Sequence, residues 1–193
     1  MKHPFRRKNL SPRLLPIYLA AAAGFIFAQP TPAGFAIGGS LAAAGLALRA
    51  WGAGHLVKND RLTVTGPYAY LRHPLYAGTL LLAAGFVLLA GGAAGAAVGL
   101  CVAPLFFLYY LPYKDRIESA RLERHYGSVY TQYRAQVPKL LPSRVPYRLP
   151  PELAHERDRR WRFACFRDNS ETGTLIGVVL VVLLFALRPA LDF

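Results

Sequence analysis

Apolar residues along this 193-residue chain are gathered into long blocks that short basic segments separate. A soluble core would instead mix apolar and polar residues at helical or alternating spacing throughout the sequence. A helix needs about 20 mostly apolar residues to cross the hydrocarbon core of a bilayer. The pattern therefore predicts an all-α fold, a polytopic membrane helical bundle.

We predict five transmembrane spans from these blocks. In chain order they cover residues 14–28, 32 to 51 or 54, 75–90, 93–110 and 175–187, the last extended back toward Glu171. The second block is rich in Gly and Ala, which let two helices approach closely in a bilayer. The first block follows a basic N-terminus and so resembles a signal peptide. The further spans and the short turn after it favour a plain transmembrane helix.

The basic residues follow the same division of the chain. Of 23 Lys and Arg, five precede the first block, four lie in residues 49–72, 13 lie in residues 114–167, and one is Arg188. With five spans, 22 of the 23 share one side, which the positive-inside rule makes cytoplasmic. The N-terminus is then inside and the C-terminus outside, in the inner membrane if the cell is bacterial. Anionic lipid headgroups, rather than nucleic acid, account for the formal net charge of +13.

One stretch places polar chemistry where the chain enters the third block. Residues 66–78 read Gly-Pro-Tyr-Ala-Tyr-Leu-Arg-His-Pro-Leu-Tyr-Ala-Gly. Ionisable residues at such depth are costly, so Arg72 and His73 are candidate functional residues. The alternative is a basic anchor beside the membrane, for which Arg72 alone would suffice.

A second polar segment, residues 116–138, follows the fourth block. Blocks three and four form a helical hairpin, so both polar segments are expected at the same cytoplasmic face. Apolar and aromatic residues recur here at steps of four, three and four, which predicts one face of an amphipathic helix. They are Leu122, Tyr126, Val129 and Tyr133.

Glu118 lies one helical turn before Leu122, at the edge of this face, whereas Glu123 points away from it. A carboxylate on the inward face needs a partner, and Arg72 and Arg116 are the candidates. Glu118 is therefore the better site residue, and Glu123 is expected to be solvated or paired with a nearby Arg. A structural ion pair that closes the hairpin is the alternative role for Glu118.

Together the two segments resemble the isoprenylcysteine carboxyl methyltransferase family of integral membrane methyltransferases, whose superfamily includes phospholipid methyltransferases. The first signature is Gly-Pro-Tyr followed by Arg-His-Pro-x-Tyr-x-Gly, in residues 66–78. The second consists of Glu118, Leu122, Tyr126-Gly127, Tyr130, Tyr133 and Val137-Pro138. The likeness covers roughly residues 55–142. Ser119 stands where the family often has a second Glu, and Tyr126 replaces the commoner Phe.

The resemblance implies that S-adenosylmethionine binds in a cytoplasmic pocket between the two segments. The cofactor-binding residues that it implies are Tyr68, Arg72, His73, Pro74, Tyr76, Gly78, Tyr113, Glu118 and Leu122. The implied catalytic residues are Glu118 and Arg116, and no metal is expected. Arg72 and His73 would hold the carboxylate of the cofactor and Glu118 its ammonium group, while tyrosines would contact the adenine or the sulfonium.

The resemblance also implies a lipophilic acceptor that arrives laterally from the bilayer, either an isoprenylcysteine-type carboxylate or a related lipid. A carboxylate is already ionised at neutral pH and needs no general base. An ammonium, phenol or thiol would need one, and His73, His125 and Glu118 are the options. This difference mildly favours an acceptor that is already ionised.

The expected organisation is a methyltransferase-like core (residues 1–142), a basic cytoplasmic linker (143–170) and an extra transmembrane helix (171–193). Two other functions stay open. One is a membrane reductase that uses NADPH on sterol-like or isoprenoid substrates, although the chain is short for it and has no dinucleotide fingerprint. The other is a non-enzymatic membrane scaffold or transporter, although transporters place ionisable residues near the bilayer midplane. Here the blocks carry charge only near their ends.

Overall fold

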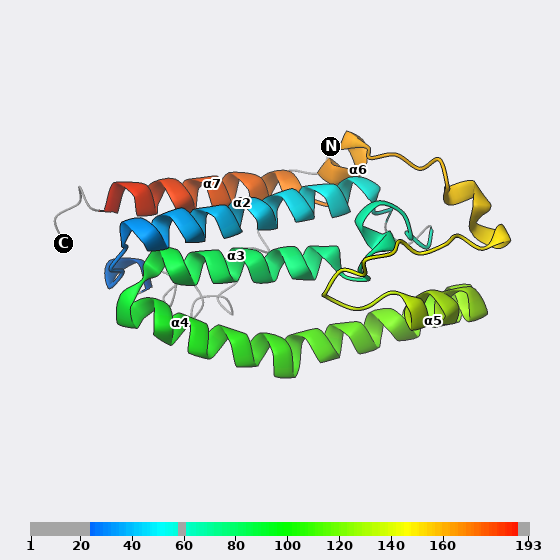
Figure 1. Ribbon diagram of the computed structural model, residues 1–193, viewed down its shortest axis with the longest axis horizontal. Coiled ribbons are helices and arrows are strands. Elements are labelled where there is room, and N and C mark those ends of the chain that lie inside the picture. The colour runs from blue at the N-terminus through cyan, green and yellow to red at the C-terminus, as the bar shows by residue number, and fades with distance from the viewer. Residues whose placement is uncertain (1–23, 58–60, 189–193) are drawn as a thin grey trace.

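The computed structural model describes residues 24–57 and 61–188, and all the regular structure in these two ranges is helical. Figure 1 shows a bundle of long helices whose loops and short helices gather at one end. The long helices are α2 (Pro32–His55), α3 (Pro74–Ala90), α4 (Gly92–Pro104), α5 (Leu111–Gln136) and α7 (Glu171–Leu187). The short ones are η3 (Gly66–Ala69), η5 (Pro151–Glu156) and α6 (Phe163–Asp168). The all-α class is as the sequence predicted.

Within residues 24–57 and 61–188, two helices are long and apolar enough to cross a membrane. One is α2, and the other is a helical stretch of 45 residues, Gly92–Gln136, with a kink at Gly127. The second helix comprises α4, a π-helical stretch η4 (Leu105–Tyr110) and α5. Two shorter apolar helices, α3 and α7, lie in the same bundle. The predicted first span falls mostly outside the described residues, so the count of five stays a prediction.

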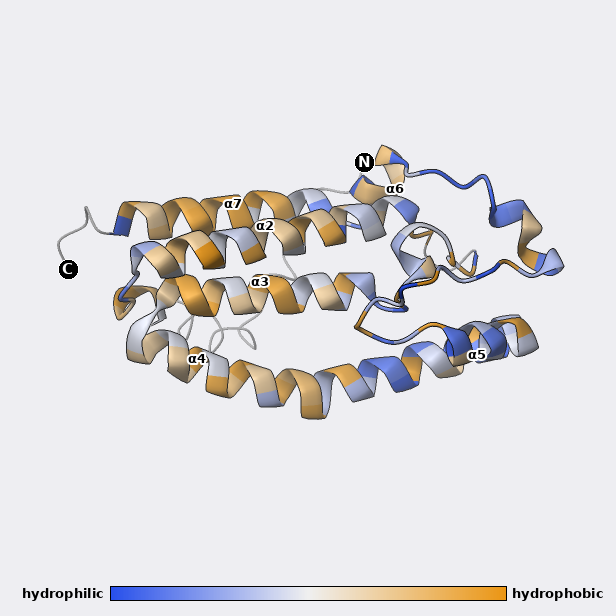
Figure 2. Ribbon diagram, in the orientation of Figure 1, coloured by the Kyte–Doolittle hydropathy of each residue, from blue (hydrophilic) through white to orange (hydrophobic). Residues whose placement is uncertain are grey.

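Polarity changes along the length of the bundle. Figure 2 shows apolar residues over α2, α3, α4 and α7, and polar residues over α5 and the loops at the other end. Several large apolar side chains of the bundle face outward, and Leu100 and Leu108 are 77% and 79% exposed. An apolar surface of this kind suits contact with lipid rather than with water.

Glycines set the contact between α2 and α3. A Cβ added at Gly38 would lie 2.6 Å from the carbonyl oxygen of Gly85, and one added at Gly45 would lie 2.8 Å from that of Gly78. The two backbones therefore touch directly, which is the packing that small residues allow between membrane helices. The close helix contact expected of the second block is present.

Gly38→Ala is expected to destabilise the protein by about 1–3 kcal/mol, because the new methyl group meets backbone that can yield only if the helices separate. The measurement is thermal unfolding in detergent. Gly39→Ala is the matched control, since an added Cβ there has no described atom within 4 Å. Alanine normally favours a helix over glycine, so the control should unfold at an equal or higher temperature. Equal destabilisation by the two variants would contradict this contact.

A buried ion pair fastens α7 to α2. Arg49 donates from Nη2 to Oε1 of Glu171 at 2.6 Å and from Nε to Oε2 at 2.9 Å. The side chains are 16% and 6% exposed. Nη1 of the same guanidinium donates to Oγ1 of Thr79 at 2.6 Å and to the carbonyl oxygen of Leu75 at 3.1 Å. One side chain thus connects α2, α3 and α7.

The basic linker closes the end of α2. Nδ2 of Asn169 donates to the carbonyl oxygens of Ala53 (3.0 Å) and Leu56 (2.9 Å). The indole N–H of Trp161 donates to the carbonyl oxygen of Ala50 at 2.8 Å. The last carbonyls of a helix lack partners within the helix, so the two bonds from Asn169 satisfy groups that the fold would otherwise leave open. The bond from Trp161 further ties the segment to α2. The linker, to which the sequence assigned no role, braces the bundle.

Candidate active site

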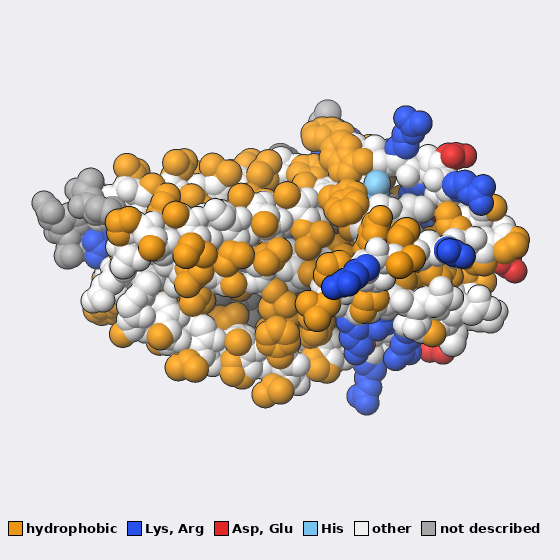
Figure 3. All heavy atoms as spheres, in the orientation of Figure 1, with side chains coloured by type: hydrophobic (Ala, Val, Ile, Leu, Met, Phe, Trp, Pro, Cys, Tyr) orange, Lys and Arg blue, Asp and Glu red, His pale blue; other side chains and the backbone are white. Residues whose placement is uncertain are grey.

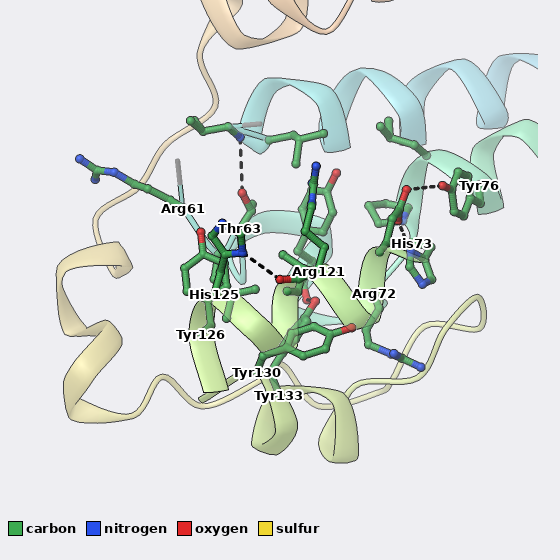
Figure 4. A pocket seen from close by; sticks show the side chains of 18 residues that line it. Arg61, Thr63, Arg72, His73, Tyr76, Arg121, His125, Tyr126, Tyr130 and Tyr133 are labelled. Atoms are coloured by element: carbon green, nitrogen blue, oxygen red, sulfur yellow. Dashed lines mark hydrogen bonds and ion pairs between the residues drawn. The ribbon is translucent and has the colours of Figure 1, made fainter. Parts of the chain in front are cut away.

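A cavity of about 500 Å³ lies at the polar end of the bundle, shown in Figure 4. Its walls come from residues 56–57 and 61–63, from Tyr68 and residues 72–76, and from α5. The two polar segments that the hairpin argument brought together do face each other across this space. The cavity is therefore the candidate active site.

Most of the predicted cofactor-binding residues line the cavity. They are Tyr68, Arg72, His73, Pro74, Tyr76, Glu118 and Leu122. Residues outside the predicted cofactor-binding set also line it, among them Arg61, Thr63, Arg121, Tyr126, Tyr130 and Tyr133. Figure 4 shows the labelled side chains converging from the segment 61–76 and from α5.

Three predicted site residues lie elsewhere. Gly78 packs against Gly45 and the side chain of Arg49, in the contact between α2 and α3. Tyr113 is half exposed and stacks on Tyr109, with the ring centroids 6.0 Å apart. Arg116, predicted to be catalytic, is exposed and does not line the cavity. It precedes Glu118 by two residues, which turns it by about 200° around the helix.

Local backbone chemistry shapes the first signature. Gly66 has a φ of 60°, and a Cβ there would lie 2.2 Å from Cδ2 of the His55 ring. Only glycine fits both the conformation and this contact. Pro67 and Pro74 then stand in the first turns of η3 and α3, where a missing N–H costs nothing. These residues fix the backbone on both sides of Arg72 and His73, immediately before α3.

Asp115 is a charged residue of the site that sequence reasoning missed. Nζ of Lys139 lies 2.5 Å from its Oδ2, Nε2 of His73 lies 2.9 Å from its Oδ1, and Nη1 of Arg72 lies 3.6 Å from the same Oδ1. The helical spacing could have predicted this residue. Ser119 and Asp115 lie three and seven residues before Leu122, on the same face of the helix.

Burial alone would raise the pKa of the Asp115 carboxyl, but three cationic or hydrogen-bonding partners outweigh it. Hydrogen bonds from Lys139 and His73, and the charge of Arg72, lower that pKa to about 2. The carboxylate is therefore ionised throughout the neutral range. Its contribution to stability is present above the ordinary pKa of 3.8 and is lost as the pH falls through about 2.

Glu118 has different partners from those predicted. The Tyr76 hydroxyl donates to its Oε1 at 2.5 Å, and its Oε2 lies 3.7 Å from Nδ1 of His73. Neither Arg72 nor Arg116 pairs with it, because Arg72 turns toward the more deeply buried Asp115. By contrast Glu123 is 51% exposed and lies 3.9 Å from Arg134, as expected for a solvated residue.

Ser119 explains why a second Glu is missing from the signature. Its side chain is buried, lies 2.8 Å from the hydroxyl of Tyr130, and donates to Oδ1 of Asp115 at 3.4 Å. A Glu at this position would bring a second carboxylate against Asp115, which like-charge repulsion disfavours. Ser119 is therefore compatible with the neighbouring Asp115 carboxylate, whereas the second Glu of the family pattern would not be.

The predicted amphipathic helix is not one regular helix. Gly127 has φ 52° and ψ −128°, so α5 consists of two limbs joined by a kink. Figure 1 shows α5 turning back at its far end. The second limb returns Tyr130 and Tyr133 to the cavity, and the hydroxyl of Tyr133 donates to the carbonyl oxygen of Tyr68 at 2.7 Å. The predicted stripe residues still meet, but through this reversal.

Arg72 lines the cavity, and among the described residues of the first signature it alone has buried side-chain donors without a hydrogen-bond partner. It is 7% exposed, and neither Nε nor Nη1 has a hydrogen-bond partner in the described structure. A buried donor left without a partner costs about 1–3 kcal/mol. The pair with Asp115 at 3.6 Å neutralises charge but does not satisfy these donors. The cavity is thus prepared for an anionic group.

Fold and cavity together define a helical protein with membrane-length helices and a charged ligand site at one end of the bundle. Residues 41–129 match the model of the phospholipid methyltransferase family. This match agrees with the resemblance that the two signatures indicated, to the superfamily of membrane methyltransferases that joins this family to the isoprenylcysteine carboxyl methyltransferases. The match contains the whole first signature and the first half of the second, from Glu118 to Gly127. No curated protein and no solved structure shows significant similarity to the chain.

Proposed function

We propose that the protein is an S-adenosylmethionine-dependent methyltransferase that acts at the cytoplasmic face of a membrane on a lipophilic acceptor. The observation that carries the proposal is the buried Arg72 side chain, which lines a cavity of about 500 Å³ and whose Nε and Nη1 have no hydrogen-bond partner in the described structure. A space of this size suits a small-molecule ligand. The family match supports methyl transfer as the reaction.

The residues present fit this cofactor. Arg72 offers its N–H groups to the carboxylate, a charge-assisted pairing that guanidinium geometry favours. Glu118, 38% exposed on the cavity wall, offers a carboxylate to the ammonium group. Tyr126, Tyr130 and Tyr133 supply aromatic surface for the adenine or the sulfonium. When bound, the cofactor supplies an activated methyl group.

A second cavity supports a lipophilic acceptor. It measures about 1400 Å³, and its walls are mostly apolar side chains from α2, α3, α4 and residues 138–142. Figure 3 shows apolar side chains around a hollow on this face of the bundle. Tyr70, Leu71 and Ala77 line it, whereas Arg72, His73 and Tyr76 line the polar cavity. The first signature therefore lies between the apolar cavity and the polar cavity. An acceptor whose hydrocarbon chain occupies the apolar cavity would bring its head group to the polar one.

The protein contributes mainly by alignment. Methyl transfer is an in-line displacement, and holding two reactants in the reactive geometry supplies about 7–11 kcal/mol of the barrier. The wall of residues 70–77 fixes the distance between the two cavities, and Pro74 anchors it at the start of α3. The apolar side of this wall also keeps water from the reacting atoms.

Calorimetric titration of the detergent-solubilised protein with S-adenosylmethionine tests the proposal. Binding is expected, and membranes from expressing cells should transfer label from methyl-labelled cofactor into a lipid-soluble product that control membranes lack. Absence of binding would overturn the proposal. Oxidation of added NADPH in the presence of a lipid extract, without such binding, would instead favour the reductase.

Glu118→Gln is expected to weaken cofactor affinity or turnover by about tenfold or more, because a charged partner of the ammonium group is lost. Glu123→Gln removes the same charge from the same helix but outside the cavity, and should behave as wild type. Calorimetry and the labelled-methyl assay measure the two effects. Equal losses in both variants would show that Glu118 does not face the cofactor.

A further inference from the structure

His73 has one ring nitrogen held by a carboxylate and the other turned to the cavity. Nε2 lies 2.9 Å from Oδ1 of Asp115, and the ring is only 8% exposed. Nδ1 lies 3.7 Å from Oε2 of Glu118, too far for a hydrogen bond. The ring also stacks on Tyr76, with centroids 5.2 Å apart and planes at 27°. Packing and hydrogen bonding therefore fix its orientation.

The ionised state of Asp115 decides the tautomer of His73. An ionised carboxylate can only accept a hydrogen bond, so Nε2 of His73 must carry the proton that it donates. In the neutral ring the lone pair then resides on Nδ1, the atom on the cavity side. Asp115 is held in turn by Nζ of Lys139 at 2.5 Å and by the Ser119 hydroxyl at 3.4 Å.

We propose that Asp115 is a positioning residue that orients His73, so that Nδ1 of His73 accepts a proton from the acceptor group before methyl transfer. The inference rests on the proposed function and deepens it, because it assigns the acceptor to a class that must lose a proton. Within that class, we propose an amine as the acceptor group. A carboxylate histidine pair is a recurring way to make an imidazole a directed base.

The surroundings of His73 suit the charge that this step creates. Glu118 and Asp115 flank the ring on its two nitrogen sides and stabilise an imidazolium. Arg72 faces the same Asp115 oxygen from 3.6 Å, and Lys139 neutralises the other oxygen. The Tyr76 hydroxyl is occupied by Glu118 and does not compete for Nδ1.

The step balances in protons and electrons. The ammonium group of the acceptor gives one proton to Nδ1 of His73, which leaves a neutral amine and an imidazolium. The amine lone pair forms the new C–N bond as the bond between sulfur and the methyl carbon breaks, and that electron pair stays on sulfur. A methylated ammonium and a thioether result, and the imidazolium returns its proton to water.

Nuclear magnetic resonance of the cofactor-free protein with ¹⁵N-labelled histidine gives a readout that does not depend on activity. The His73 signals are assigned as those lost in His73→Gln. In the wild type, at a pH where the ring is neutral, we expect Nε2 to be protonated and Nδ1 not. In Asp115→Asn, where the side-chain amide can donate or accept, a mixture of tautomers is expected. The same single tautomer in both proteins would overturn the role of Asp115, as would a protonated Nδ1 in the neutral wild-type ring.

Two acceptor probes test the assigned class. Vesicles that contain phosphatidylethanolamine present an ammonium group, and N-acetyl farnesylcysteine presents an ionised carboxylate. Asp115→Asn should lower kcat on the ammonium probe by about 100-fold, within the usual range for loss of general-base catalysis, with little change in KM. Glu123→Gln should match the wild type. Methylation of the carboxylate probe alone by the wild type would overturn the proposal.

Calorimetry separates failure of this inference from failure of the proposed function. Asp115→Asn should bind S-adenosylmethionine with an affinity within about threefold of the wild type, which also shows that the variant is folded. If the wild type itself does not bind the cofactor, the proposed function fails. If both bind it and kcat on the ammonium probe is unchanged, only the role of Asp115 fails.

Discussion

Replacing Arg72 with alanine is expected to abolish measurable binding of S-adenosylmethionine. The guanidinium is buried, and its Nε and Nη1 have no described hydrogen-bond partner, so both are available to the cofactor carboxylate. A hydrogen bond to a charged group contributes about 1.5–3 kcal/mol. Loss of two such bonds lowers the affinity by at least about 100-fold. Calorimetry on the solubilised protein measures the change.

Two further variants make this result specific. Arg116→Ala removes the same charge from an exposed position outside the cavity and should leave the affinity unchanged. Arg72→Lys keeps the charge but not the planar fork and should lie between wild type and Arg72→Ala. Lys139 and His73 still pair with Asp115 in every variant, so the fold should persist. Equal loss in Arg116→Ala would mean that charge alone, rather than the site, holds the cofactor.

Glu171→Leu is expected to destabilise the protein by about 3–5 kcal/mol, because it leaves the buried Arg49 guanidinium without its carboxylate. Unfolding in detergent, followed by temperature or denaturant, measures the loss. The double variant Arg49→Met with Glu171→Leu removes both charges and should recover most of the stability. A double variant as unstable as the single one would show that packing, and not the unpaired charge, is responsible.

Connectivity and periodicity were enough to predict the helical class and the meeting of the two polar segments. The Gly91-Gly92 turn makes α3 and α4 a hairpin, so the chain before α3 and the chain after α4 must end on the same side. The spacing from Leu122 to Tyr133 then indicated which face of α5 turns inward. These features are local in sequence, and local rules describe them well.

The rest depended on contacts between distant residues. The kink at Gly127 needs a glycine, but many glycines do not kink a helix, so only the fold shows that this one does. Gly78 was predicted to bind the cofactor because it belongs to the first signature. In the structure it packs against α2 instead. The pairing of Arg72 with Asp115 spans two segments, and the sequence offered Glu118 as an equally good partner.

The ion pair between Arg49 and Glu171 also orders the assembly of the protein in time. The two residues are 122 positions apart, so at about 5–20 residues per second Arg49 is synthesised about 6–24 s before its partner. During that interval its guanidinium can use the Thr79 hydroxyl and the Leu75 carbonyl, which the ribosome delivers much earlier. The α2–α3 pair can thus form first with its arginine partly satisfied. Arrival of α7 then completes the salt bridge and closes assembly of the bundle.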